Sequence, residues 1–122
     1  MAIETYIEDC KRSESTVFQT DAKVERLLHS SLGIHTEGAE FADALKKFVF
    51  YGKKELDEVN MKEELGDLLW YVAIACDALG TSFDELMETN INKLKARYPE
   101  KFSLDKAENR DLNAEREILE NS

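Results

Sequence analysis

The sequence predicts an all-α fold, an antiparallel helical bundle in which residues 1–122 form a single domain. Two observations carry this prediction. The chain has one proline, Pro99, and only five glycines, while residues that favour helix, such as Glu, Lys, Leu and Ala, are abundant. Its apolar residues recur at the spacing of a helix, and no segment shows the alternation of a β-strand.

Two helical patterns are expected in the N-terminal part of the chain. The first covers about residues 3–10 and is followed by a polar break at residues 13–16. The second begins after Asp21, a suitable N-cap, and continues to Val49. Gly33 interrupts this second pattern, which is therefore compatible with one long bent helix or with two shorter helices.

The most apolar helix is expected over residues 61–79. Asn60 is the predicted cap, with Glu63 three residues later as its capping-box partner, and Gly80 is expected to end the helix. Residues 68–75 are apolar on nearly every side of this helix, which predicts that it is buried on most sides.

Two more helices are expected at the C-terminal end. Ser82 is the predicted cap of a helix that runs to Arg97 and is stopped by Pro99. Ser103 is the predicted cap of a highly charged helix that ends near Glu120. Its apolar residues are sparse, so it is expected to be peripheral or to pack on another subunit.

Charge and composition exclude several kinds of protein. The net charge of −10 argues against binding to nucleic acid, although a divalent cation can still bridge an acidic protein to a phosphate. Cys10 and Cys76 lack the spacing of a metal or redox pair and are expected to be buried free thiols. The start at Met1 does not resemble a signal peptide and residues 68–75 are too short to span a membrane, which predicts a cytoplasmic protein.

Two pairs of acidic residues carry the strongest chemical signal. Glu37 and Glu40 lie three residues apart, as do Glu64 and Asp67, so the members of each pair share one face of a helix. If the two helices pack antiparallel, the four carboxylates converge. A hard cation such as Mg²⁺ would relieve their mutual repulsion by binding their oxygens.

Salt bridges offer an alternative interpretation of these acids. The same spacing occurs elsewhere in the chain, where it is typical of solvated helix faces, and Lys46, Lys47 or Lys53 could pair with the acids. Glu64 and Asp67 differ because they open the most apolar helix, where an acid without a partner is costly. The residue spacings of di-iron, zinc and EF-hand calcium sites are absent.

Polar and aromatic residues on other helices are candidates for substrate binding. Asn90, Lys93 and Arg97 share one face of a helix and could hold phosphate oxygens, although a solvated face gives the same pattern. His29 and Trp70 could stack on a base, but Trp70 is expected to lie in the core.

Three blocks of the sequence resemble the MazG-like nucleotide pyrophosphohydrolases, which belong to the all-α nucleoside triphosphate pyrophosphatase superfamily. The resemblance covers about residues 25–111. Its blocks are Leu28-His29-Ser-Ser-Leu-Gly33 with Glu37-Gly-Ala-Glu40, then Glu63-Glu64-Leu-Gly-Asp67-Leu-Leu-Trp70-Tyr71, then Asn90-Ile-Asn-Lys93-Leu-Lys-Ala-Arg97-Tyr98-Pro99.

The resemblance implies Mg²⁺-dependent hydrolysis of nucleoside or deoxynucleoside triphosphates at the α-phosphate, which yields the monophosphate and pyrophosphate and controls a nucleotide pool. Mn²⁺ is the expected substitute for Mg²⁺. The implied metal ligands are Glu37, Glu40, Glu64 and Asp67, and Glu63 joins them in the catalytic set. The implied substrate-binding residues are Asn90, Lys93, Arg97, Lys53, His29 and Tyr71.

The resemblance also implies self-association, as a dimer or a tetramer whose helical core is completed by a second subunit. Within the same superfamily, hydrolysis of phosphoribosyl-ATP is the alternative activity. From another class, the chain is a non-catalytic helical interaction protein, or a nucleotide-binding module that a metal stabilises without turnover.

Overall fold

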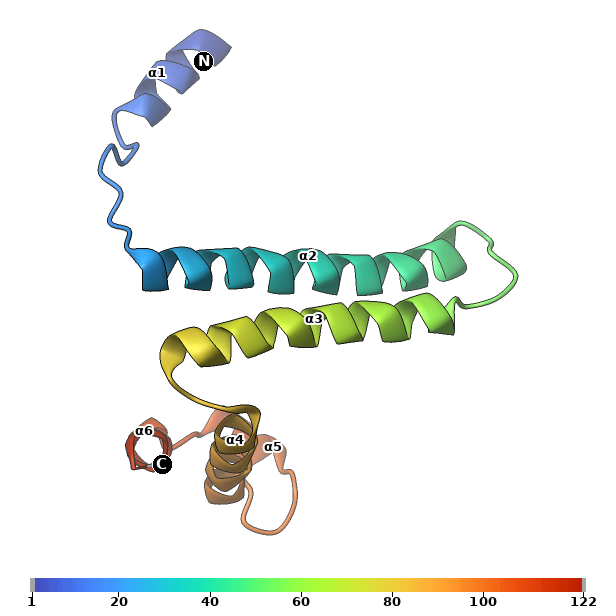
Figure 1. Ribbon diagram of the computed structural model, residues 1–122, viewed down its shortest axis with the longest axis vertical. Helices are drawn as coiled ribbons and strands as arrows, with labels where there is room; N and C mark the ends of the chain where they lie inside the picture. The colour runs from blue at the N-terminus through green and yellow to red at the C-terminus, as the bar shows by residue number, and fades with distance from the viewer. Residues whose placement is uncertain (1, 122) are drawn as a thin grey trace.

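The computed structural model describes residues 2–121, and all the regular structure in that range is helical. The prediction of an all-α fold is therefore confirmed. Figure 1 shows the helices in chain order: α1 (Ile3–Lys11), α2 (Ala22–Phe50), α3 (Glu58–Leu79), α4 (Phe83–Arg97), α5 (Leu104–Glu108) and α6 (Leu112–Glu120).

The hairpin of α2 and α3 is the main contact between helices, and the two helices run antiparallel (Figure 1). As predicted, Asp21 caps α2, because its Oδ1 accepts a hydrogen bond from the backbone N–H of Val24 at 2.8 Å. Gly33 does not divide α2. It lies against the ring of Tyr71, and a Cβ atom at position 33 would overlap that ring, so the glycine marks a close approach of α2 and α3.

Helix α3 begins at Glu58, three residues earlier than predicted. Asp57 is the N-cap in place of Asn60, because Asp57 Oδ1 accepts a hydrogen bond from the backbone N–H of Asn60 at 3.0 Å. Asn60 therefore lies within the helix, and its side chain is available for another partner. Gly80 ends the helix as predicted, in a left-handed conformation with φ of 70°.

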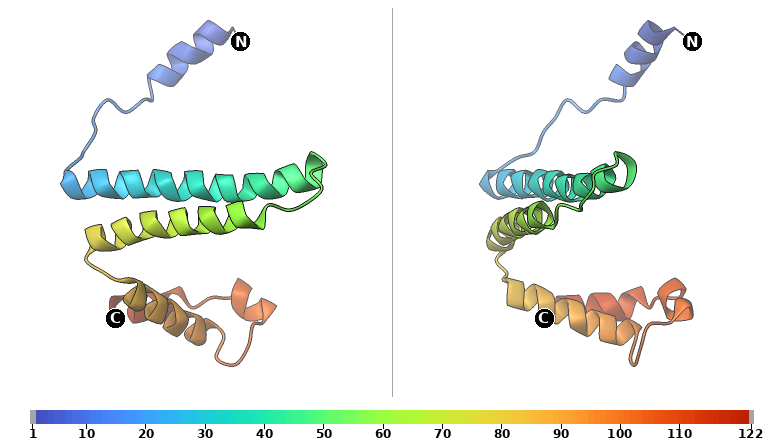
Figure 2. Two further views of the ribbon diagram at one scale, coloured as in Figure 1. Left: turned by 45° about the vertical axis from the view of Figure 1, so that its right-hand side comes forward. Right: turned by 90° about the vertical axis from the view of Figure 1, so that its right-hand side faces the viewer.

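The C-terminal part differs from its prediction in one respect. Helix α4 is capped by Ser82 and ends at Arg97, as expected. The single helix predicted after Ser103 is wrong: a second cap, at Asp111, accepts a hydrogen bond from the N–H of Ala114 at 3.0 Å and starts α6 separately from α5. Helix α6 packs beside α4, as Figure 2 shows.

The isolated chain has little interior. Among residues 2–121, Cys76 alone forms the buried apolar core. Leu69 and Trp70 are 53% and 55% exposed, so the expected burial of α3 on most sides is wrong for a single copy. Cys10 is exposed because α1 lies apart from the α2–α3 hairpin (Figure 2), which corrects the prediction for this thiol. None of the described helices is long and apolar enough to cross a membrane.

Candidate functional site

Three glutamates from the α2–α3 hairpin lie together and are called here the acidic cluster: Glu37 and Glu40 of α2, and Glu64 of α3. One carboxylate oxygen of each lies within 4.8 Å of the corresponding oxygen of the other two. The antiparallel packing of the helices brings these three together, whereas the sequence predicts that four carboxylates converge, with Asp67 as the fourth. Oxygens at this separation can contact a single hard cation.

Two oxygen atoms of the acidic cluster are buried without a partner. Glu64 is only 6% exposed. Its Oε2 atom and the Oε2 atom of Glu37 are inaccessible to solvent and form no hydrogen bond. Burying a carboxylate oxygen without a partner is costly, because the lost hydration is not replaced. Carboxylate oxygens in this arrangement fit a divalent cation, which would satisfy both atoms.

The members of the acidic cluster alter one another's pKa values. The pKa of Glu37 is raised from 4.5 to about 7, first by the adjacent carboxyl group of Glu64, then by burial and by the charge of Glu40. The pKa of Glu40 is raised as well, again mainly by the adjacent carboxyl group of Glu64. The pKa of Glu64 is lowered, first by the adjacent carboxyl group of Glu37 and further by the hydrogen bond that Asn60 donates. Without a cation, the acidic cluster therefore retains a proton more readily than ordinary glutamates do.

Two further acids of the predicted set, Glu63 and Asp67, do not belong to the acidic cluster. The charge of Asp67 contributes to the raised pKa values of Glu37 and Glu40, so it is near, but Asp67 is exposed and does not belong to the group of three. Glu63 is also exposed. The roles of Asp67 as a metal ligand and of Glu63 as a catalytic residue stay predictions.

Lysines do not neutralise the acidic cluster. Lys46 and Lys47 pair instead with Asp43, at N–O distances of 4.0 and 2.8 Å. Within residues 2–121, no salt bridge joins a member of the acidic cluster to a cationic side chain. The structure thus contradicts the salt-bridge interpretation for these three glutamates.

A polar pocket of about 210 Å³ adjoins the acidic cluster at the loop end of the hairpin. It contains Lys53, one of the predicted substrate-binding residues, and Asn60, whose amide donates a hydrogen bond to Glu64. The pocket is lined by Asp43, Ala44, Lys47, Lys53, Glu55, Asp57 and Asn60. Asn60 is a contributor that the sequence pattern does not reveal, because its spacing to Glu63 is that of a capping box. The four-residue separation from Glu64 is the signal that could have identified it.

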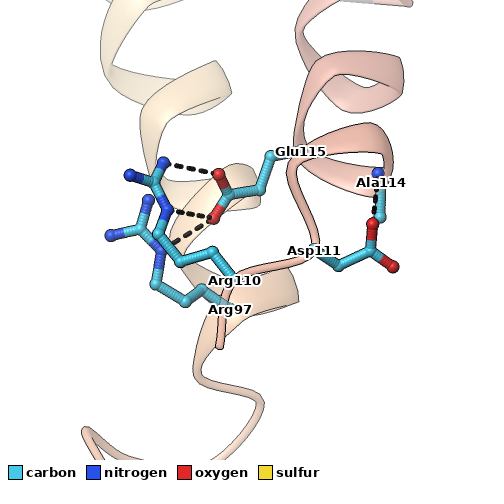
Figure 3. Close-up of polar contacts among 5 residues, drawn as sticks. All are labelled: Arg97, Arg110, Asp111, Ala114 and Glu115. Atoms are coloured by element: carbon cyan, nitrogen blue, oxygen red, sulfur yellow. Dashed lines mark hydrogen bonds and ion pairs between the residues drawn. The ribbon is translucent and has the colours of Figure 1, made fainter. Parts of the chain in front are cut away.

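Arg97, a predicted phosphate ligand, is engaged in an ion pair (Figure 3). Its Nε donates a hydrogen bond to Oε1 of Glu115 at 2.7 Å, and Nη2 of Arg110 donates to Oε2 at 2.6 Å. Glu115 is 4% exposed, and its pKa is lowered to about 2, first by Arg97 and then by Arg110. In this conformation Arg97 ties α4 to α6, and its role toward phosphate stays a prediction.

The structure does not bring the substrate-binding row of α4 to the acidic cluster. In the described range, Asn90, Lys93 and Arg97 form no hydrogen bond or ion pair with it. Helix α4 follows the far end of α3, and residues 64–79 span roughly 22 Å at about 1.5 Å per residue. Asn90 instead borders an apolar groove of about 530 Å³ between α3, α4 and α6.

Aromatic rings gather where α2 and α3 approach. The ring centroids of His29 and Tyr71 are 5.7 Å apart, and those of Trp70 and Tyr71 are 5.0 Å apart, both with edge-to-face geometry. Tyr71 follows Asp67 by one helical turn, while His29 and Trp70 are exposed. Rings in these positions suit stacking on a base, which stays a prediction for His29 and Tyr71.

Comparison with known proteins identifies relatives of the region that contains the acidic cluster. Residues 28–102 match the family model of the MazG nucleotide pyrophosphohydrolase domain. The chain is also similar to the gene 37 protein of Mycobacterium phage L5, with 30% identity over 77 residues that cover 61% of this chain and 68% of the relative. No solved structure matches the chain.

Proposed function

Because the chain belongs to the MazG nucleotide pyrophosphohydrolase family, we propose that it hydrolyses nucleoside or deoxynucleoside triphosphates to the monophosphate and pyrophosphate, with Mg²⁺ bound at the acidic cluster. One observation supports this above all others: the Oε2 atoms of Glu37 and Glu64 are buried within the acidic cluster, and no amide, hydroxyl or cationic group of the described residues donates a hydrogen bond to them. Such a reaction would adjust a nucleotide pool, and we expect it in the cytoplasm.

The ligand chemistry of the acidic cluster favours Mg²⁺, with Mn²⁺ as a substitute, because its ligands are hard carboxylate oxygens. Glu37, Glu40 and Glu64 would hold the ion, and we propose Asp67 as the fourth ligand. When bound, the ion supplies charge neutralisation for the triphosphate and makes a coordinated water more acidic.

The remaining chemistry belongs to the chain's own residues. In the proposed reaction, water oxygen bonds to the α-phosphorus, the α–β anhydride bond breaks, and pyrophosphate leaves. Glu63 would help to orient the water. Lys53, in the polar pocket beside the acidic cluster, would contact the departing phosphates, while His29 and Tyr71 would contact the base. Asn90, Lys93 and Arg97 are not brought to the acidic cluster within one copy, so they would bind the phosphates only if a second subunit of the proposed oligomer presented them.

Self-association as a dimer or a tetramer is part of this proposal. A single copy leaves large apolar side chains of α3 and α4 uncovered, Leu69, Trp70 and Met87 among them, and its buried apolar core is minimal over the described residues. Apolar surface of this kind favours burial against a partner. The molar mass in solution, measured by light scattering, tests this part: a mass of about 14.0 kDa would contradict it.

The experiment for the activity is the release of pyrophosphate from a panel of ribo- and deoxyribonucleoside triphosphates, with Mg²⁺ and with excess chelator. We expect release of pyrophosphate, without single phosphate, that the chelator abolishes. Release from phosphoribosyl-ATP alone would favour the alternative activity. If Mg²⁺ raises the melting temperature but no substrate is cleaved, the chain is a metal-stabilised binding module. If Mg²⁺ does not raise the melting temperature and no substrate is cleaved, the acidic cluster is not a metal site.

A further inference from the structure

Asn60 forms a specific contact with the most buried member of the acidic cluster. Its Nδ2 donates a hydrogen bond to Oε1 of Glu64 at 3.0 Å, one helical turn along α3. Neither side chain is fully exposed, since Glu64 is buried and Asn60 is half-buried. The bond is therefore shielded in part from competing water.

This hydrogen bond gives the two oxygens of Glu64 different roles. Oε1 is held by the amide, whereas Oε2 is buried and has no partner. A carboxylate fixed at one oxygen loses rotational freedom at the other. The free oxygen of Glu64 is thus kept in place for a ligand before any ligand arrives.

We propose that Asn60 is a positioning residue for the candidate metal centre, and that its amide holds Glu64 in the orientation in which it binds a cation. The inference rests on the proposed function for the presence of the metal. Asn60 lies outside the two acid pairs on which that proposal depends, and it would act on the ion only through Glu64.

The chemistry of an amide suits this position better than that of a charged side chain. A lysine would also donate a hydrogen bond to Glu64, but its positive charge would compete with the metal ion for the carboxylates. An aspartate would add a further negative charge and could not donate. The asparagine amide orients Glu64 and leaves the negative charge of the acidic cluster for the cation.

The side chain of Asn60 is not required to start α3. Asp57 caps the helix through the backbone N–H of residue 60, a donor that alanine also provides. Alanine is in addition a better helix former than asparagine. Asn60→Ala therefore removes the contact with Glu64 and keeps the local structure of the helix.

The test is the affinity of the full-length chain for Mn²⁺, measured by isothermal titration calorimetry without nucleotide. We expect Asn60→Ala to weaken Mn²⁺ binding about 10-fold, the lower end of the effect of removing a partner that orients a metal ligand. Asn60→Gln keeps a donor on a longer arm and should recover part of the affinity. Asn113→Ala removes an exposed asparagine of α6 and should bind Mn²⁺ like the unmodified chain.

Two results would overturn the inference, and they are distinguishable. If the unmodified chain binds Mn²⁺ and Asn60→Ala binds it equally well, Asn60 has no positioning role while the metal centre stands. If the unmodified chain does not bind Mn²⁺ at all, the proposed function fails together with the inference. Melting temperatures in chelator, expected to be similar for all four proteins, separate a loss of folding from a loss of metal binding.

Discussion

Two glutamates of this chain experience opposite surroundings. Glu115 lies between two arginines, Arg97 and Arg110, which lower its pKa to about 2. Glu37 lies among other carboxylates, which contribute to raising its pKa to about 7. The first carboxylate joins α4 to α6 (Figure 3), and the second, on α2, lies close to that of Glu64 on α3.

The difference teaches how to separate a structural acid from a functional one in an acidic protein. Around Glu115 the chain supplies its own positive charge, so folding alone satisfies the carboxylate. Around Glu37 the described chain supplies negative charge and neighbouring carboxyl groups, so the charge is balanced by a bound proton or, as we propose, by a cation from solution. Substitutions at the two kinds of acid test this distinction, and the largest effect is expected at the acids of the candidate metal centre.

Removing charge from the predicted metal ligands should abolish turnover. Glu40→Gln and Asp67→Asn each keep the shape of the side chain, and we expect each to reduce pyrophosphate release more than about 100-fold. Removing a residue that only hydrogen-bonds a metal ligand costs up to about 100-fold, and loss of the ligand itself should cost more. The variants should still fold, as judged by circular dichroism. Glu88→Gln, at an exposed acid of α4, is the matched control and should retain activity. Full activity in both ligand variants would contradict the site assignment.

Removing the structural acid should act on stability, whatever the metal concentration. Glu115→Gln leaves the guanidinium groups of Arg97 and Arg110 without their carboxylate, so we expect a fall of several degrees in melting temperature that Mg²⁺ does not reverse. Differential scanning calorimetry with Mg²⁺ and with chelator measures this. Glu117→Gln changes an exposed acid of the same helix and serves as the control. An unchanged melting temperature would show that the ion pair contributes nothing measurable.

The close approach of α2 and α3 at Gly33 should affect the α2–α3 hairpin and its acidic cluster, but not the contact between α4 and α6. In Gly33→Ala the new Cβ overlaps the ring of Tyr71, and overpacking costs about 1–3 kcal/mol. We expect a lower free energy of unfolding and weaker Mn²⁺ binding, because the helices that carry the acidic cluster must separate. Gly38→Ala is the control within the same helix: it meets open space and should gain up to about 1 kcal/mol from helix propensity. Urea unfolding compares the two, and equal stability would contradict the role of the contact.

The smallest expected effect is on the pH dependence of stability, to which Glu37 and Glu115 should contribute with opposite signs. The pKa of Glu37 in the folded chain is raised from 4.5 to about 7, so its contribution to stability is present below about pH 4.5 and is lost as pH rises toward 7. The pKa of Glu115 is lowered from 4.5 to about 2, so its contribution is present above pH 4.5 and is lost as pH falls toward 2. In chelator, the urea midpoint should therefore fall between pH 5 and pH 8, and Glu37→Gln should flatten that change. A midpoint that rises over this range in chelator would contradict the assignment.

Much of the fold is predictable because its determinants are local. The helical period of the apolar residues and the end signals at Asp21, Ser82 and Gly80 are properties of short segments. The acidic cluster is also predictable, because a three-residue spacing fixes a helix face and antiparallel packing brings two such faces together. Where two good caps compete, as Asp57 and Asn60 do, the sequence does not decide between them.

The errors arise from contacts between distant segments. The apolar period shows which side of α3 avoids water but not whether the same chain covers it, so burial is overestimated for Trp70 and Cys10. The pairing of Arg97 with Glu115 depends on how α6 folds back onto α4, and no local pattern in the sequence reports it. The sequence for that reason predicts a phosphate ligand where the structure also shows an ion pair.

The contact between Gly33 and Tyr71 has a consequence for the alignment of the two long helices. In an antiparallel pair, moving one residue forward along α2 corresponds to moving one residue back along α3. Four steps from that contact lead to Glu37 and Asp67, and three more lead to Glu40 and Glu64, the two acid pairs. The glycine–tyrosine contact thus sets the register of the acids from a distance.

Inserting one residue between this contact and the acids would turn the later acids by about 100° and advance them by about 1.5 Å, away from their partners. The same insertion in the exposed loop at residues 51–57 would leave the alignment intact. The alignment of the acids therefore does not depend on the length of the loop, but it does depend on the number of residues along each helix between the glycine–tyrosine contact and the acids.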